Sequence, residues 1–165
     1  LLYQLQALKE SNKLKFNYVI MNNLYGIGDN FDIENGHVIP ALIHKCYLSK
    51  KNKRKFKVLG KVTDKRNFLN SIDAAKALII IAKKSNYNLI NLGSKEEISI
   101  KKLANLIMKI SNNKNDIIWE RIDNQAVRKR QLDLTRINSL KFEEKYSLEE
   151  GLRETYNWFV EKKIK

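Results

Sequence analysis

The chain has 165 residues, 43% of them hydrophobic, which is enough to bury one sizeable core and does not fit a disordered polypeptide. Its net charge of +14 comes mostly from scattered Lys residues, and the dense basic run 50–55 lacks interleaved aromatic residues, so we expect no nucleic-acid partner. We expect neither a signal peptide nor a membrane span, and the single Cys46 fits a reducing, cytoplasmic compartment.

The first fifty residues predict a helix, a strand, a long loop and a second helix. Four leucines on one stripe predict a helix over residues 1–13, and a strand is expected over 16–21. Residues 22–36 are rich in Asn, Asp and Gly, a composition typical of a loop. Residues 38–49 predict a helix that tolerates a Pro in its first turn.

The middle of the chain continues this alternation. A strand is expected over 56–59, followed by a turn over 60–65 and an extended segment over 67–72. Asp73 is expected to cap a helix over 74–84.

The last part of the chain carries clear local signals for further elements. In order, we expect a buried strand over 88–92, a helix over 100–111 capped by Ser99, a strand over 116–120, a polar and basic loop over 121–131, a short helix over 135–140, and a final helix over 148–162 that begins with a capping box of Ser147 and Glu150. Strands alternating with helices predict an α/β chain, and no linker or internal repeat divides it.

Several common catalytic motifs are absent from the sequence. Gly26-Ile27-Gly28 lacks the third Gly and the helix start of a dinucleotide-binding loop. Two His and one Cys are too few for a metal constellation, and no Ser nucleophile elbow is present. Tyr47 and Lys51 match the string Y-x-x-x-K, but no preceding strand or nucleotide loop supports a catalytic pair, so we interpret them as helix surface.

Candidate ligand-binding residues gather between positions 22 and 66. Asn22 and Asn23 follow a buried strand directly, at the strand end where open α/β sheets bind ligands, although an Asx turn is the alternative. His37 stands at the start of a helix, where it either does acid–base chemistry or binds the helix backbone. Arg66 follows a turn led by Gly60 and is either an anion-binding residue or a surface cation.

The ordered motifs of this chain resemble the extended short-chain dehydrogenase/reductase (SDR) family of nucleotide-sugar enzymes. The motifs that carry the resemblance are N-L-Y-G at 23–26, D-N-F at 29–31, H-V-I-P-A-L-I at 37–43, G-x5-R-x-F-L at 60–69, D-x-A at 73–75, I-N-x-G at 90–93, I-S-I at 98–100, S-L-E-E-G at 147–151 and T-x-x-W at 155–158. Each motif is weakly specific by itself, but their order and spacing extend over nearly the whole chain.

The resemblance implies a fold and an activity. It implies that residues 1–165 are the C-terminal part of a Rossmann-type enzyme, comprising the last sheet strands and the small α/β substrate-binding lobe, without the N-terminal cofactor-binding half. Within the family the sequence is most similar to the GDP-L-fucose synthases. That similarity implies 3,5-epimerisation and NADPH-dependent 4-reduction of a GDP-4-keto-6-deoxy-hexose, by a homodimer that uses NADP(H) and no metal. The chain alone is then expected to be inactive.

The resemblance also assigns residue roles. His37 matches the acid of the epimerisation, and Asn23, Leu24 and His37 match positions that line the cofactor. The matching positions for the nucleotide sugar are Lys45, Arg66, Arg128, Lys129 and Arg130.

Some positions depart from the GDP-L-fucose synthase pattern. Leu59 stands where those enzymes have Trp, Val62 replaces a Gly, and Lys141-Phe142 replaces Gly-Trp. These departures leave the base and the sugar open. The alternatives are another nucleotide-sugar epimerase/dehydratase of the same family, or a non-catalytic fragment that binds a polyanion through residues 50–55 and 128–130.

Overall fold

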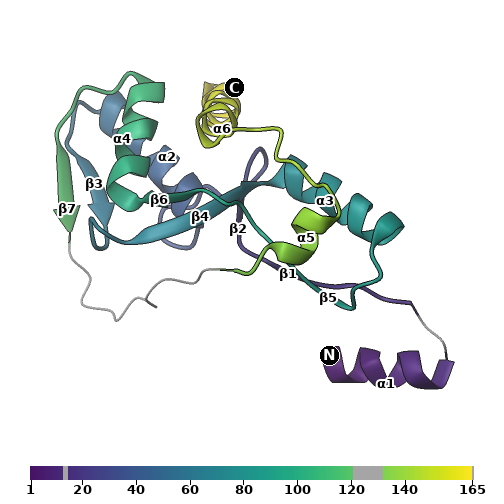
Figure 1. Ribbon diagram of the computed structural model, residues 1–165. Coiled ribbons are helices and arrows are strands. Elements are labelled where there is room, and N and C mark those ends of the chain that lie inside the picture. The colour runs from purple at the N-terminus through teal and green to yellow at the C-terminus, as the bar shows by residue number, and fades with distance from the viewer. Residues whose placement is uncertain (13–14, 121–131, 165) are drawn as a thin grey trace.

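The computed structural model describes residues 1–12, 15–120 and 132–164, and it confirms the expected α/β organisation (Figure 1). The elements are, in chain order, α1 (Leu2–Asn12), β1 (Tyr18–Met21), β2 (Asn23–Tyr25), α2 (Val38–Lys51), β3 (Phe56–Leu59), β4 (Lys65–Asn70), α3 (Ser71–Lys84), β5 (Leu89–Leu92), β6 (Glu97–Ser99), α4 (Ile100–Ser111), β7 (Ile117–Glu120), α5 (Thr135–Ser139) and α6 (Leu148–Ile164). The loop expected over 121–131, with the candidates Arg128, Lys129 and Arg130, lies outside the described residues.

The described structure contains two hydrophobic clusters, each packed between strands and helices. One cluster lies between the parallel pair β1–β5 and helices α3 and α5, and it includes the fully buried Ile90 and Leu92. The other joins α2, α4 and α6 to the sheet β2–β4–β6 and the parallel pair β3–β7, and it includes the fully buried Ile43 and Phe56. Figure 1 shows β4 and β6 running from the second group toward the first.

The chain passes from one sheet to the other at a single residue, Asn22. The Asn22 backbone N–H donates to Leu92 O at 2.9 Å and so continues the β1–β5 ladder by one residue. The next residue, Asn23, already pairs in parallel with Phe68 of β4. The side chains of Asn22 and Asn23 therefore both lie at the carboxyl end of β1.

Two strands and one helix start differ from the sequence-based expectations. Strand β2 lies inside the segment expected to be a loop, and β6 was not expected, because strands of three residues are too short to show an alternating pattern. The helix expected to begin after Asp73 begins at Ser71, because the Asn70 side chain accepts the Ile72 N–H at 2.9 Å. The prediction that Asp73 caps this helix is therefore wrong.

The two other predicted caps are confirmed. The Ser99 hydroxyl accepts the Lys102 N–H at 3.2 Å at the start of α4. At the start of α6, the Ser147 N–H donates to Glu150 Oε2 at 2.9 Å, and the Glu150 N–H donates to Ser147 Oγ at 3.3 Å. These are the reciprocal bonds of a capping box, so local sequence decided both helix starts.

Asp73 has a tertiary role instead. It is fully buried, and its Oδ2 accepts the backbone N–H groups of Lys145 and Tyr146, each at 3.0 Å. The carboxylate thus ties α3 to the segment that leads into α6. Within the described ranges, no helix has the length and apolar character needed to span a membrane.

Replacing Asp73 by Ala should destabilise the fold, because two N–H groups would lose a charged acceptor. We expect a loss of about 2–4 kcal/mol in the free energy of unfolding, measured by urea denaturation. The matched control is Asp133→Ala, which removes an exposed carboxylate that caps only the local turn at Thr135. An Asp73→Ala loss no larger than that of the control would contradict the tertiary role.

Candidate functional site

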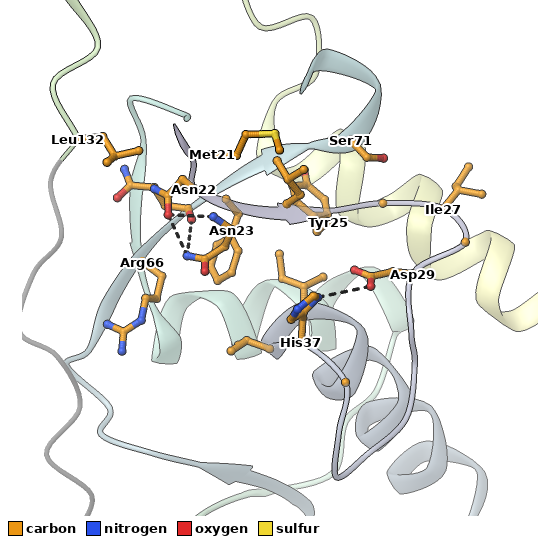
Figure 2. A pocket seen from close by; sticks show the side chains of 18 of the residues that line it. Met21, Asn22, Asn23, Tyr25, Ile27, Asp29, His37, Arg66, Ser71 and Leu132 are labelled. Carbon is orange, nitrogen blue, oxygen red and sulfur yellow. Dashed lines mark hydrogen bonds and ion pairs between the residues drawn. The ribbon is translucent and has the colours of Figure 1, made fainter. Parts of the chain in front are cut away.

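An open cavity of about 1110 Å³ lies at the carboxyl ends of β1 and β2, beside the start of α2 (Figure 2). Its wall includes Asn23 and Leu24 from β2, His37 from the start of α2, and Arg66 from β4. Four of the residues predicted from the sequence therefore meet around one space. In parallel strands, this edge is the usual place for ligands in an open α/β sheet.

The two asparagines at the strand exit have different roles. The Asn22 Oδ1 accepts the backbone N–H of the next residue, Asn23, at 2.8 Å, which is not the bond to the second residue along that defines the alternative, an Asx turn. The Asn23 side chain instead donates through Nδ2 to Asn22 Oδ1 and to Asn67 O, both at 3.1 Å. Within the described residues its Oδ1 forms no hydrogen bond, so this carbonyl can accept one from a ligand.

Asn67 supports this arrangement from the neighbouring strand. Its Nδ2 donates to Ser94 O at 3.1 Å and to Glu96 O at 3.0 Å, which ties β4 to the chain before β6. Its own carbonyl is the acceptor for Asn23. The orientation of the Asn23 amide is thus fixed by one backbone carbonyl of β4 and by the Asn22 side chain.

His37 occupies the N-cap position of α2 with an extended backbone, φ −64° and ψ 166°. Its side chain makes no capping hydrogen bond and is 80% exposed, so binding the helix backbone is not its role. The ring lies at the cavity, and its Nδ1 is 3.6 Å from Asp29 Oδ1 (Figure 2). The other ring nitrogen, Nε2, is therefore the one available to a ligand.

Arg66 is the second residue of β4, and its side chain lines the cavity. Its Nη1 donates to Lys65 O at 2.8 Å, and its Nη2 lies 3.8 Å from Asp64 Oδ2. The side chain is 31% exposed, so the guanidinium is held in place but remains open to an anion. A planar guanidinium in this state binds a phosphate or carboxylate through paired N–H groups.

Tyr25 closes the floor of the cavity. It is 2% exposed, and burial raises the pKa of Tyr25 well above the ordinary value of about 10, while a hydrogen bond with Asn70 offsets only part of this. Gly151 of α6 lies against the Tyr25 hydroxyl: a Cβ at Gly151 would collide with Tyr25 Oη and lie 2.8 Å from Asn70 Nδ2. Absence of a side chain at Gly151 thus lets α6 pack onto the site.

Other predicted residues do not reach this cavity. Lys45 is half-buried on α2 and is not among the lining residues, so its role stays a prediction. His44, to which no role was given, bonds through Nδ1 to Phe31 O at 2.7 Å. Tyr47, interpreted from the sequence as helix surface, is instead partly buried and packs edge-on against Phe159, with ring centroids 5.6 Å apart.

The structure also brings Asp29, Tyr25 and Asn67 to the site, three residues for which the sequence alone indicated no role. Asp29 and Tyr25 belong to the D-N-F and N-L-Y-G motifs, and that was the available signal. Their placement depends on long-range contacts that no local pattern reveals. Across the described part of the chain, no group of three or more His, Cys, Asp or Glu side chains is arranged to hold a metal ion.

Comparison with known sequences gives a consistent set of relatives. A profile of the NAD dependent epimerase/dehydratase family matches residues 2–93. The GDP-L-fucose synthase of Sinorhizobium fredii is 35% identical over 157 residues, which cover 94% of this chain and 50% of that protein. The chain spans about half the length of the curated relatives it matches.

Comparison with solved structures confirms the fold. The GDP-L-fucose synthetase of Naegleria fowleri bound to NADP superposes with a TM-score of 0.82 at 32% identity, covering 98% of this chain and 50% of that one. The UDP-N-acetylglucosamine 4-epimerase of Methanobrevibacter ruminantium, in complex with UDP-N-acetylmuramic acid, gives 0.84 at 23% identity over 97% of this chain and 51% of that one. The expected fold, the C-terminal part of a Rossmann-type extended SDR, is thus observed.

The buried Tyr25 hydroxyl should make the stability of the chain sensitive to alkaline pH. Since its pKa is raised in the folded state, the stabilisation is complete below pH 10 and is lost as the pH rises above that value. The slope should approach about 1.4 kcal/mol per pH unit, and Tyr25→Phe should remove it. Urea unfolding between pH 9 and 11 measures this, with the 85% exposed Tyr3→Phe as control. Equal slopes for Tyr25→Phe and the unaltered chain would contradict the assignment.

Proposed function

The chain belongs to the NAD dependent epimerase/dehydratase family, and we propose that it forms the substrate-binding part of an enzyme like the GDP-L-fucose synthases. In this proposal, residues 1–165 are the C-terminal portion of an enzyme that epimerises C3 and C5 of a GDP-4-keto-6-deoxy-hexose and then reduces C4. The observation that carries the proposal is the convergence of Asn23, His37 and Arg66 on one cavity.

The three side chains offer three different interactions. Asn23 presents a fixed carbonyl acceptor, His37 an imidazole nitrogen, and Arg66 a tethered guanidinium. A nucleotide sugar needs a cation for its diphosphate, and epimerisation beside a ketone needs a group that returns a proton to carbon. The arrangement therefore matches both the binding and the chemistry of such a substrate.

The residues also fit one end of a nicotinamide cofactor. When bound, NADP(H) supplies the hydride for the reduction at C4. The carboxamide of a nicotinamide ring donates hydrogen bonds, and the Asn23 Oδ1 at the start of β2 is a suitable acceptor, with the half-buried Leu24 beside it. We assign only this end of the cofactor to the chain, because no Gly-rich phosphate loop precedes a helix in its sequence.

In the epimerisation, His37 has the role of the acid. A base removes the proton next to the keto group, and His37 returns a proton from Nε2 on the opposite face. Imidazole suits this step because it exchanges a proton near neutral pH. Arg66 binds the diphosphate and so holds the sugar ring next to His37 in the cavity.

The proposal includes an assembly and a location. A homodimer formed through a pair of helices is supported by α1, where Tyr3 is 85% and Leu8 45% exposed. A cytoplasmic location is supported by the fully buried Cys46, a free thiol bonded to Ser111 Oγ at 3.2 Å.

The structure bears on two alternatives, a polyanion-binding fragment and a related enzyme with another substrate. In the basic run, Lys50 donates to the carbonyl of Ser111 at 2.7 Å, and nearby Lys57 pairs with Glu120 at 2.9 Å, so part of this charge already serves the fold rather than a polyanion. Leu59 is 43% exposed at the end of β3, where the synthases carry a Trp. That difference favours, as the second candidate, a related enzyme whose substrate carries a different base.

The chain should bind a GDP-sugar through Arg66. We expect calorimetry with GDP-mannose to show saturable binding that Arg66→Ala weakens about 10–100-fold, the effect of losing a charge-assisted contact. The matched control is Arg54→Ala, in the exposed basic run, which should change affinity little. Stronger loss in Arg54→Ala than in Arg66→Ala, with competition by duplex DNA, would instead support the polyanion-binding fragment.

His37 should matter for epimerisation more than for reduction. The chain would be joined to the part of the Sinorhizobium fredii synthase that it does not cover, and assayed with GDP-4-keto-6-deoxymannose and NADPH. We expect His37→Gln to slow incorporation of solvent deuterium into the sugar by about 10²–10⁴-fold, with a smaller effect on NADPH oxidation by substrate already epimerised.

The control for this experiment is His44→Gln, which keeps a donor for the Phe31 carbonyl and should retain activity. Equal losses of deuterium incorporation in the two variants would mean that His37 has no specific role. An inactive joined enzyme that nonetheless binds NADP and GDP-mannose would argue against the proposed reaction.

A further inference from the structure

We propose that Asp29 is the positioning residue for His37: its carboxylate keeps a proton on Nδ1, so that Nε2 is the nitrogen that exchanges a proton with the substrate. This inference deepens the proposed function and rests on it. It concerns a residue that binds no substrate and acts only through His37.

The geometry of the pair supports this role. His37 Nδ1 lies 3.6 Å from Asp29 Oδ1, and within the described residues Asp29 is the one carboxylate paired with this ring. The Asp29 side chain is 17% exposed while that of His37 is 80% exposed, so the carboxylate is the more buried member of the pair, beside the ring at the wall of the cavity (Figure 2). Catalytic contacts in ligand-free proteins are often longer than the hydrogen bonds they become when substrate binds.

The carboxylate is itself held in place. Asp29 Oδ1 accepts the Asn30 N–H at 2.7 Å, which fixes the orientation of the side chain. Gly28, immediately before it, has φ +82°, a left-handed conformation that favours Gly and turns the chain toward His37. The position of Asp29 is thus a property of the backbone.

The loop between Asp29 and His37 is braced by its own side chains. Asn30 Oδ1 accepts the Asp32 N–H at 3.0 Å, and Asp32 Oδ1 accepts the N–H groups of Glu34 at 3.0 Å and Asn35 at 2.6 Å. The Asp32 carbonyl accepts the Gly36 N–H at 3.0 Å. Successive turns of this kind leave the seven-residue connection, residues 30–36, little freedom to separate the two members of the pair.

The loop is also anchored to two helices, α6 and α2. Phe31 stacks on Phe159 of α6 with ring centroids 4.6 Å apart, and lies 5.8 Å from Trp158. His44, on α2, bonds through Nδ1 to the Phe31 carbonyl at 2.7 Å. Asp29 and His37 are therefore fixed to the same body, the packed pair of α2 and α6.

This arrangement decides which nitrogen transfers the proton. In the charged imidazolium, both nitrogens carry hydrogen. When the Nε2–H bond breaks and the proton forms a C–H bond at the enolate carbon, the ring becomes neutral with its remaining proton on Nδ1, facing Asp29. The ring then recovers a proton at Nε2 from solvent, so the carboxylate never exchanges a proton itself.

The tautomer of His37 tests the proposal directly. In long-range ¹H–¹⁵N spectra of the labelled chain at alkaline pH, where the rings are neutral, we expect His37 to be mainly the Nδ1–H form. The chain contains one other His, His44, whose Nδ1–H bond to Phe31 O provides an internal standard for that form. Asp29→Asn removes the charge but keeps the oxygen that accepts the Asn30 N–H, and should turn His37 mainly to the Nε2–H form of an unpaired imidazole.

The matched control is Asp32→Asn, the same change on the same loop, which should leave the His37 tautomer unaltered. A mainly Nε2–H His37 in the unaltered chain, no change in Asp29→Asn, or the same change in Asp32→Asn would each overturn the proposal. GDP-mannose binding measured on the unaltered sample separates the two questions: a confirmed tautomer without binding would reject the proposed function and leave the Asp29–His37 pair standing.

Discussion

The site depends on the abrupt change of strand partner at Asn22. Up to Met21 the chain pairs with β5, and from Asn23 onward it pairs with β4, so one residue serves as the joint between two sheets. The Asn22 backbone completes the first ladder while its side chain holds the first amide of the second. Because β4 runs parallel to β2, this joint also brings Arg66 to the edge where Asn23 emerges.

The remaining parts of the site are rigid for separate physical reasons. Asn23 is oriented by a backbone carbonyl of β4, Arg66 by a carbonyl and a carboxylate, and His37 by its place at the start of α2. The loop before His37 is braced by turn bonds and aromatic packing rather than by a ladder. Such fixed donors and acceptors cost little reorganisation when a charged ligand arrives, which suits binding and proton transfer alike.

Local chemistry predicted the larger elements and the caps at Ser99 and Ser147, because those signals lie within a few residues. It failed for β2 and β6, which are strands only because β4 lies between them. It misassigned Asp73, since a buried carboxylate that binds Lys145 and Tyr146 has the same sequence signature as a helix cap. The partnership of Asp29 with His37 could not be predicted either, because loop geometry, not spacing, brings them together.

We propose that the cavity at the joint is a nucleotide-sugar site. Titration of the ¹⁵N-labelled chain with GDP-mannose, followed by amide and side-chain chemical shifts, tests it most directly. We expect saturable shifts at Asn23, His37 and Arg66, with the basic run 50–55 unaffected. Shifts confined to that run, or none at any concentration of the sugar nucleotide, would contradict it.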